Sequence, residues 1–293
     1  MNVNERSKNH QELGTRLNPL LYEATVRMAL LEDLGFGDLT TDATVDPSRR
    51  AKATITAKQP GIIAGLDVAA SAFHLLDQEL KFEALVADGD EVSPGQILAT
   101  VEGPARALLS AERTALNFLQ RLSGIATATR LAVERVKPFK ACILDTRKTT
   151  PGLRLLEKYA VRVGGGRNHR FGLSDAVMIK DNHIAAAGGI AAAMMLVRER
   201  VGPLTKVEVE TECLAQVEEA LQAGADVIML DNMPVDLMRG AVASVAGRAL
   251  TEASGGITLE TLTEVAATGV DFISLGWLTH SCRALDISLR IVS

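Results

Sequence analysis

The sequence predicts an α/β protein, with a small sheet and covering helices in its N-terminal part and a parallel α/β barrel in its C-terminal part. Two patterns support this. Between residues 19 and 105 helical and strand patterns are mixed, whereas after residue 140 short apolar runs alternate with helix-like segments. Such alternation, with strands this apolar, is typical of parallel strands covered by helices. Polar residues end the runs, as expected at a barrel mouth.

The N-terminal part begins with a helical pattern that ends at Gly35 and continues through strands, a second helix and a hairpin. Residues 50–66 alternate as strands and are interrupted at Pro60-Gly61, and two further strands meet at Pro94-Gly95. The predicted segments are a helix at 19–35, strands within 50–66, a helix at 68–78, two strands within 86–103, and a long helix at 105–136 that Gly124 would interrupt.

After residue 140, six strand–helix units are clear and a seventh is conceivable. The strands are ACILDTRK, DAVMIKDN, KVEVETE, DVIMLDN, ALTEASGG and DFISLG, and their ends carry Lys148, Lys180, Glu210, Asp231, Ser254 and Gly276. Since the chemistry of α/β barrels lies at the C-terminal ends of the strands, these six positions are the main functional signal of the sequence.

Composition excludes several classes of protein. The 293 residues carry a net charge of −5, which argues against general nucleic-acid binding because phosphate backbones require a basic face. Three cysteines without a CxxC pair argue against a disulfide framework or a zinc site and favour a reducing cytoplasm. We see no signal peptide and no run of eighteen apolar residues, so no membrane span is expected. Residues 1–18 are predicted to form a flexible tail.

Positive charge is concentrated in one segment. From Asp145 to His183 there are eight Lys or Arg and four acidic residues, so this segment is +4 in a chain of −5. Cations near strand ends repel one another unless an anion binds, and arginine forks match carboxylates and phosphates. We therefore expect a ligand with several carboxylates or phosphates. For Arg154 and Lys158 we favour the alternative of a solvated helix face.

Two glycine-rich stretches have both structural and ligand-binding interpretations. GGG at 164–166 can cap the preceding helix, and it can also bring the backbone close to a ligand. For His169, just beyond this stretch, a role as a hydrogen-bonded structural histidine is about as well supported as a role in ligand binding. In EASGGIT, Ser254 and the following glycines come after a strand and before a helix at 258–269, a position that favours phosphate binding.

Carboxylates form the other half of the expected site. Glu208, Glu210 and Glu212 alternate onto one side of a strand, and Asp231 ends the next one. Oxygen ligands of this kind suit Mg²⁺, which often binds through substrate phosphates with few protein contacts. No His/Cys cluster has the spacing of a zinc site.

Eight motifs occur in an order that resembles the quinolinate phosphoribosyltransferase family over about residues 20–291. They are LEDLGFGDLTTD, ERTALNFLQRLSGIAT, DTRKTTPGLR, EKYAVRVGGGRNHRFGLSDAVMIKDNHI, VEVE, LDN, SGGI and LTHS…ALDISL. The resemblance implies an N-terminal α/β sandwich at 19–122, to which 279–293 return, and an incomplete, about seven-stranded α/β barrel at 123–278. It also implies a homodimer with shared active sites and the joining of quinolinate to phosphoribosyl pyrophosphate with decarboxylation, on the route to NAD.

The resemblance also assigns roles to residues. Quinolinate would be bound by Arg113 of the neighbouring subunit together with Thr146, Arg147, His169, Arg170 and Lys180. Phosphoribosyl pyrophosphate would be bound by Lys148, Lys180, Glu210, Asp231, Ser254, Gly255, Gly256, Ser274 and Gly276. Lys148, Glu210 and Asp231 would be catalytic, with Mg²⁺ near the last two. Trp277 departs from the small residue expected there, and could narrow the phosphate end.

Four alternatives remain open. A phosphoribosyltransferase of the same fold could act on nicotinate, although one carboxylate needs fewer cations than this set offers. A paralogue found beside molybdate-transport genes shares the fold. DGDEVSPGQIL resembles a lipoyl or biotinyl hairpin, but no lysine lies between Lys81 and Lys137. An inactive scaffold is disfavoured, because unpaired buried charges are costly without a ligand.

Overall fold

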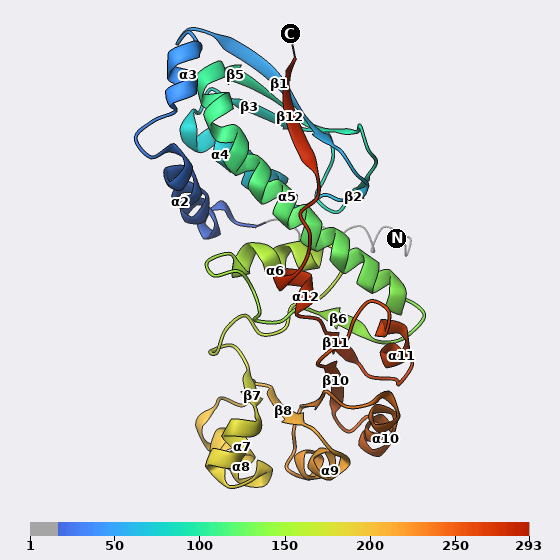
Figure 1. Ribbon diagram of the computed structural model, residues 1–293. Coiled ribbons are helices and arrows are strands. Elements are labelled where there is room, and N and C mark those ends of the chain that lie inside the picture. The colour runs from blue at the N-terminus through green and yellow to red at the C-terminus, as the bar shows by residue number, and fades with distance from the viewer. Residues whose placement is uncertain (1–16, 293) are drawn as a thin grey trace, which may run out of the picture. The chain divides into compact units, whose positions relative to one another are not determined.

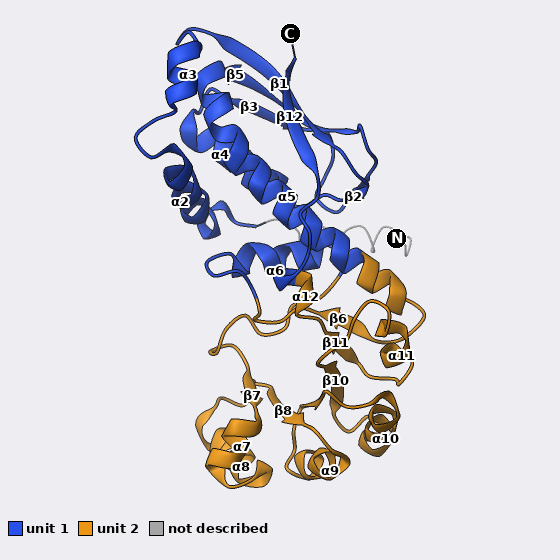
Figure 2. Ribbon diagram, in the orientation of Figure 1, with its two compact units in different colours: residues 1–130, 149–165, 279–293 blue, residues 131–148, 166–278 orange. Residues whose placement is uncertain are grey.

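The computed structural model describes residues 17–292, which form two compact units (Figure 2). Unit 1 comprises the described residues up to 130 together with 149–165 and those from 279 onward, and unit 2 comprises 131–148 and 166–278. The predicted tail lies outside the described residues except for Leu17 and Asn18. No helix in the described range is long and apolar enough to cross a membrane.

Unit 1 is built on an antiparallel sheet in the order β12-β1-β5-β3 (Figure 1). Along β1, Ala53, Ile55 and Ala57 are fully buried at alternate positions, as the sequence pattern predicts. Helix α4 packs against β3, and α2 packs against α4. The strands are β1 (Arg50–Ala57), β2 (Gly61–Ile62), β3 (Lys81–Ala84), β4 (Glu91–Val92), β5 (Ile97–Pro104) and β12 (Ile287–Val292).

The helices of unit 1 include one that continues beyond it. They are η1 (Pro19–Leu21), α2 (Glu23–Leu34), α3 (Leu39–Thr44), α4 (Leu66–Leu76), α5 (Ala105–Val136) and α6 (Arg154–Val163). The expected interruption at Gly124 is wrong, because α5 is continuous there. A Cβ at Gly124 would lie 2.1 Å from the carbonyl oxygen of Arg283, so the glycine permits close packing of another segment.

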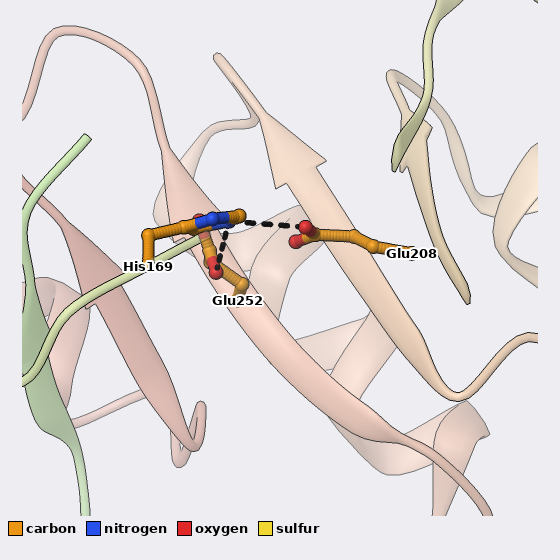
Figure 3. A group of neighbouring side chains, drawn as sticks. All are labelled: His169, Glu208 and Glu252. Atoms are coloured by element: carbon orange, nitrogen blue, oxygen red, sulfur yellow. Dashed lines mark ion pairs between the residues drawn. The ribbon is translucent and has the colours of Figure 1, made fainter. Parts of the chain in front are cut away.

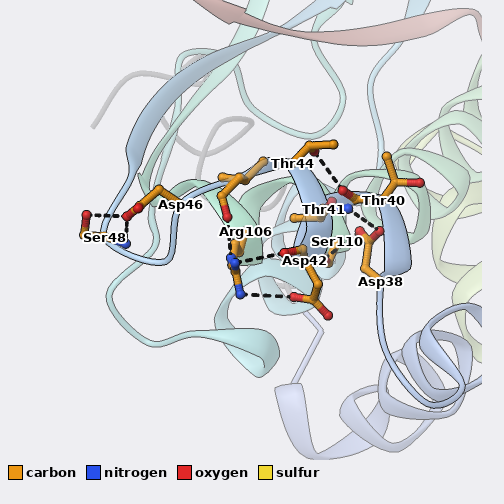
Figure 4. Close-up of polar contacts among 10 residues, drawn as sticks. Asp38, Thr40, Thr41, Asp42, Thr44, Asp46, Ser48, Arg106 and Ser110 are labelled. Atoms are coloured by element: carbon orange, nitrogen blue, oxygen red, sulfur yellow. Dashed lines mark hydrogen bonds and ion pairs between the residues drawn. The ribbon is translucent and has the colours of Figure 1, made fainter.

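The GDLTTD part of the first motif forms a polar junction between α3 and α5 (Figure 4). Asp38 caps α3 by accepting a hydrogen bond from the Thr41 amide at 3.0 Å, and it accepts another from the Ser110 hydroxyl at 2.9 Å. From α5, Arg106 donates to the Val45 carbonyl and lies 3.3 Å from an Asp42 carboxylate oxygen. This motif therefore stabilises local structure.

Unit 2 is a curved parallel sheet in the order β6-β11-β10-β9-β8-β7, with helices along its outer side (Figure 1). The strands are β6 (Cys142–Leu144), β7 (Val177–Ile179), β8 (Val207–Thr211), β9 (Val227–Asp231), β10 (Leu250–Ser254) and β11 (Phe272–Ser274). The α/β class and the parallel C-terminal sheet are confirmed. The six strands are the six clear units of the sequence, where about seven were expected.

The helices of unit 2 follow the strands, as predicted. They are α7 (Asp181–Ala187), α8 (Ile190–Arg200), α9 (Leu214–Gln222), α10 (Val235–Val245) and α11 (Leu262–Ala266), and α12 (Trp277–His280) begins in this unit. Helix α11 is shorter than expected, so residues 257–261 separate Gly256 from its first turn.

The prediction that Lys158 lies on a solvated helix face is wrong. This residue of α6, in unit 1, is only 3% exposed.

Candidate active site

The C-terminal strand ends of unit 2 carry the predicted polar residues. Asp231, Ser254 and Ser274 are the last residues of β9, β10 and β11, and Lys180 directly follows β7. Glu210 is the penultimate residue of β8, whereas Lys148 and Gly276 lie in the segments that follow β6 and β11. Parallel pairing brings neighbouring ends together, and Asp231 and Ser254 are direct partners in register.

Hydrogen bonds connect the C-terminal ends of β9 and β10, where Asn232 follows β9 and Gly255 begins the turn after β10. The Asn232 amide donates to the Ser254 carbonyl at 2.9 Å, and the Asn232 side chain donates to an Asp231 carboxylate oxygen at 2.7 Å. Gly255 has φ +91°, and a Cβ there would lie 2.2 Å from the Asn232 side-chain oxygen. Only glycine therefore fits against this side chain, whereas a Cβ at the exposed Gly256 would meet nothing within 4 Å, so the backbone at Gly256 is open to an approaching anion.

An ion pair links the ends of β7 and β8. The Lys180 ammonium group contacts the Glu210 carboxylate, whose side chain is 11% exposed, while the lysine side chain is 44% exposed. The charge of Glu210 is therefore balanced in this structure. Its carboxylate is still close enough to the strand end to meet a ligand there, whereas Glu212 lies beyond β8 and is exposed.

Two arginines of the predicted quinolinate set influence each other electrostatically. Burial, followed by the positive charge of Arg147, lowers the pKa of Arg170 from its ordinary value. The Arg170 guanidinium donates to the Ala176 carbonyl at 3.1 Å, which fixes its direction. Like charges held close together favour the binding of an anion between them. Thr146 adjoins this pair, and its hydroxyl accepts a hydrogen bond from the Lys148 amide at 3.0 Å.

The loop that carries His169 and Arg170 is attached to β6. The Arg167 amide donates to the Ile143 carbonyl at 2.8 Å. Asp145, which is fully buried, accepts a hydrogen bond from the His169 amide at 2.9 Å and another from the Asn168 side chain at 2.5 Å. This carboxylate therefore fixes the backbone where the cationic side chains begin.

Beneath the loop, the His169 ring lies between two carboxylates (Figure 3). Its Nε2 atom is 3.0 Å from an oxygen of Glu208 on β8 and 3.5 Å from an oxygen of Glu252 on β10. The two glutamates are 6% and 1% exposed. The other oxygen of each, Oε1, has no hydrogen-bond partner among the described residues.

The two glutamates cannot both be charged at low cost. Burial, and then the negative charge of Glu208, raise the pKa of Glu252 to about 8, although His169 opposes this shift. Glu252 is therefore largely protonated at neutral pH, and its proton can bridge to the Glu208 carboxylate. The group lines a cavity of about 270 Å³ together with Val177, Val227 and other residues.

Several features of this site were not found from the sequence. Glu252 lies inside EASGG but was not identified, and Asp145 was counted only as a charge. A charged residue inside an otherwise buried strand was the available signal for Glu252. Two of the three GGG glycines serve structure: a Cβ at Gly164 would lie 2.5 Å from the Ala126 carbonyl, and Gly165 has φ +97° after α6.

Two sequence-predicted residues have different surroundings from the rest. Arg113 is an exposed residue of α5 in unit 1. The indole of Trp277 donates to the Ile257 carbonyl at 3.0 Å, so it holds the segment that follows the glycines of β10.

The carboxylates offer two places for a metal ion. Glu210 and Asp231 present oxygen donors at strand ends, which fit Mg²⁺ by the chemistry of their atoms. The side chains of His169, Glu208 and Glu252 form the one group of three His, Cys, Asp or Glu ligands found among residues 17–292, with donor atoms within 4.8 Å of one another.

Comparison with known proteins gives one consistent family. The model of the quinolinate phosphoribosyl transferase N-terminal domain matches residues 38–123, and that of the C-terminal domain matches residues 125–290. A Bacillus subtilis protein named as a probable nicotinate-nucleotide pyrophosphorylase (carboxylating) is 50% identical over 94% of this chain and 95% of its own length. A chloroplastic Arabidopsis thaliana protein of that name is 48% identical over 92% of this chain and 82% of its own. The crystal structure of NadC from Streptococcus pyogenes is 45% identical, with a TM-score of 0.91 over 95% of this chain and all of that chain.

Proposed function

The chain belongs to the quinolinate phosphoribosyltransferase family, and from this premise we propose how its described residues carry out the family's reaction. The enzyme transfers a phosphoribosyl group from phosphoribosyl pyrophosphate to quinolinate, and the product loses a carboxylate to give nicotinate mononucleotide, pyrophosphate and CO₂. One observation best supports the cationic side of the site: Arg147, which follows β6, lies near enough to Arg170 for its positive charge to help lower the pKa of Arg170.

Quinolinate, with two adjacent carboxylates, binds at the cationic side. Arg147 and Arg170 face its carboxylates, Lys180 contributes a further charge, and Thr146 lies beside Arg147. His169 belongs to the same loop and fixes it from below. Two guanidinium groups side by side match two adjacent carboxylates, so a dianion is favoured over a singly charged acid.

Phosphoribosyl pyrophosphate binds along the ends of β8 to β11. The open turn at Ser254, Gly255 and Gly256 receives the 5′-phosphate, with Ser274 and Gly276 on the next strand. Asp231 and Glu210 face the ribose hydroxyls, and Lys148 with Lys180 faces the pyrophosphate. Support for this assignment is that Gly256 is exposed with open space beside its Cα atom, while Asn232 packs against Gly255 and bonds to the Ser254 carbonyl.

The chemistry then uses the substrates and these charges, without an organic cofactor. The ring nitrogen of quinolinate attacks the anomeric carbon while the bond to pyrophosphate breaks, and the carboxylates of Glu210 and Asp231 stabilise the developing oxocarbenium charge. The resulting pyridinium accepts the electron pair left when the adjacent carboxylate departs as CO₂. The ring carbon then takes up a proton.

Glu210 and Asp231 are the residues that would hold Mg²⁺, mainly through the pyrophosphate of the substrate. The ion would supply positive charge for the leaving group. Lys148 and Lys180 act on the same oxygens as fixed donors. Cys142, Cys213 and Cys282 are free thiols, which supports a reducing cytoplasm as the compartment.

A homodimer completes the site in this proposal. The partner subunit's Arg113 reaches the quinolinate site, and exposed apolar side chains of unit 1 provide contact area; they include Leu20, Leu21, Met28, Leu31, Phe36 and Leu39. If the site is shared, mixing inactive Arg113→Ala and Arg170→Ala proteins restores activity, because one site of the mixed dimer is intact. A mixture that stays inactive, although it forms mixed dimers, contradicts this arrangement.

The reaction is tested by release of labelled CO₂ from quinolinate carrying the label next to the ring nitrogen. Release should require both phosphoribosyl pyrophosphate and Mg²⁺. A parallel reaction with nicotinate should give no nucleotide. If nicotinate gives a nucleotide and quinolinate releases no CO₂, the substrate is nicotinate and the proposal for quinolinate is wrong.

A further inference from the structure

Glu208 and Glu252 stand apart from the proposed substrate contacts. They lie in the interior of the barrel, in a cavity of about 270 Å³ that is also lined by Val177, Val227 and Phe272. These three are the first residues of β7, β9 and β11, so the cavity reaches toward the opposite strand ends from Asp231 and Ser254. We therefore do not expect Glu208 or Glu252 to contact the substrate directly.

The bonds of the His169 ring define its tautomer. Nδ1 accepts a hydrogen bond from the Arg170 amide at 2.7 Å, so in the neutral ring the proton resides on Nε2. Nε2 then donates to Glu208 at 3.0 Å, with Glu252 at 3.5 Å as the second acceptor. Both ring nitrogens have partners within the protein, so the ring affects substrate binding through the residues that it holds and not by contacting the substrate.

The residue next to His169, Arg170, is one of the cations that the proposed function assigns to quinolinate. Arg170 is held through its own amide by the His169 ring and through its guanidinium by the Ala176 carbonyl. Asp145 holds the His169 amide from the other side. Displacement of the ring would therefore release the backbone from which the Arg170 side chain extends.

We infer that Glu208, assisted by Glu252, is a positioning residue: it orients the His169 ring and, through it, holds Arg170 where the quinolinate carboxylate binds. This inference rests on the proposed function of Arg170. His169 acts through these bonds, and the buried acids give the loop its fixed geometry before substrate arrives. Such preorganisation matters because an ångström of misplacement at a charged site costs much of its binding energy.

A metal ion is the competing explanation for the same three side chains. Nε2 would then need its lone pair for the metal, and a metal-bound histidine donates its other N–H to an acceptor. In this structure Nδ1 instead receives a hydrogen from the Arg170 amide. The hydrogen-bond directions therefore favour a protonated Nε2 and a carboxylate acceptor over a metal site.

The main test replaces Glu208 with Ala in the full-length enzyme. Loss of a charge-assisted hydrogen bond should raise the KM for quinolinate by roughly tenfold to a hundredfold. The KM for phosphoribosyl pyrophosphate should change less than about twofold, because the strand ends that bind it are untouched. Glu208→Gln keeps an acceptor and should restore most of the affinity. Glu199→Ala, an exposed glutamate on α8 that the proposed site does not include, is the control and should behave as wild type.

A double mutant separates positioning from direct contact. If His169 acts through Glu208, Glu208→Ala and His169→Ala each raise the quinolinate KM, and the double variant is no worse than the more affected single one. Multiplying effects would mean that His169 binds substrate independently, which would overturn the inference. Equal rises in both KM values would also overturn it, since they indicate general loss of structure.

A measurement on the unmodified enzyme covers the case in which the variants fail to fold. Nitrogen-15 spectra of labelled histidine, assigned with His169→Asn, should show the Nε2–H tautomer for His169. An Nδ1–H tautomer, or a stoichiometric metal ion in the purified protein that Glu208→Ala loses, would overturn the inference. If wild-type enzyme releases no CO₂ from quinolinate, the proposed function fails; if it does and Glu208→Ala is unaffected, only this inference fails.

Discussion

Two polar clusters in this molecule use the same residue types in opposite ways. In the Asp38 cluster of unit 1, which consists of Asp38, Asp42, Arg106 and Ser110, carboxylates accept from amides, hydroxyls and a guanidinium (Figure 4). Hydrogen bonds from Thr41 lower the pKa of Asp38. In the His169 cluster of unit 2, which consists of His169, Glu208 and Glu252, two buried carboxylates share one ring (Figure 3), and the pKa of Glu252 is raised.

The difference shows how to tell a stabilising polar network from one that supports a site. A network that only stabilises gives each carboxylate enough donors, so the charged form is favoured. Among the described residues, the His169 cluster leaves one oxygen of each glutamate without a hydrogen-bond partner, and it places two buried carboxyl groups beside each other. The arginine pair above it has the same character, because Arg147 lowers the pKa of Arg170. Such unfavourable arrangements persist where function requires them.

The largest effect is expected from removing Arg170, which the proposed function places against a quinolinate carboxylate. Arg170→Ala should lower the affinity for quinolinate by at least about a hundredfold, since two charge-assisted hydrogen bonds are lost. Calorimetry with quinolinate measures this directly, and thermal melting should remain near that of wild type. The control is Arg239→Ala on α10, an exposed arginine that pairs only locally with Asp236. Unchanged quinolinate binding in Arg170→Ala would remove Arg170 from the site.

The next effect tests the raised pKa of Glu252. The ordinary pKa is 4.5 and folding raises it to about 8, so folding favours the protonated form. The stability from this group is complete below about pH 4.5 and is lost as pH rises through about 8. Glu252→Gln stays neutral, so its stability relative to wild type should increase between pH 5 and pH 9, by on the order of a few kcal/mol.

Denaturant unfolding at pH 5, 7 and 9 measures the Glu252 effect. Glu212→Gln, an exposed glutamate just past the same sheet edge, should show no such trend. If the difference between Glu252→Gln and wild type is constant with pH, Glu252 titrates normally. The contrast between the two clusters would then lose its electrostatic basis.

Substitutions at two neighbouring glycines test the role of Asn232 at the turn formed by Ser254, Gly255 and Gly256. In Gly255→Ala the added Cβ meets the Asn232 side chain at 2.2 Å and φ is +91°, so we expect a loss of about 2–3 kcal/mol in stability. Gly256→Ala meets open space at φ +62°, and should lose only about 1 kcal/mol. The KM for phosphoribosyl pyrophosphate should rise in Gly255→Ala and much less in Gly256→Ala. Equal effects would mean that Asn232 does not hold the turn.

The sequence predicted the alternation of unit 2 well, because buried parallel strands read as apolar runs and end in polar residues. Lys180, Asp231 and Ser254 could be placed at strand ends for this reason. Gly124 was misjudged because the approach of Arg283 is a tertiary contact, which a local helix propensity does not contain. The shortened α11 reflects the same limit.

The buried part of the site could not be predicted in the same way. Glu252 and Glu208 are 44 residues apart in sequence and meet only because β8 and β10 face one interior. The sequence alone supported a structural role and a ligand-binding role for His169 about equally. Its ring bonds give it a structural partner and a position beside Arg170, two facts that depend on folded geometry.

The smallest effect concerns the cluster that only stabilises. Asp38→Ala removes the N-cap of α3 and the acceptor for Ser110, and should lower stability by about 1 kcal/mol. Thermal melting should show a fall of a few degrees, while both KM values remain within about twofold of wild type. Asp38→Asn, which keeps a capping oxygen, should recover most of the loss. A clear rise in either KM at unchanged stability would show that the Asp38 cluster also acts on substrate, and that satisfied carboxylates do not distinguish a stabilising network from a catalytic one in this enzyme.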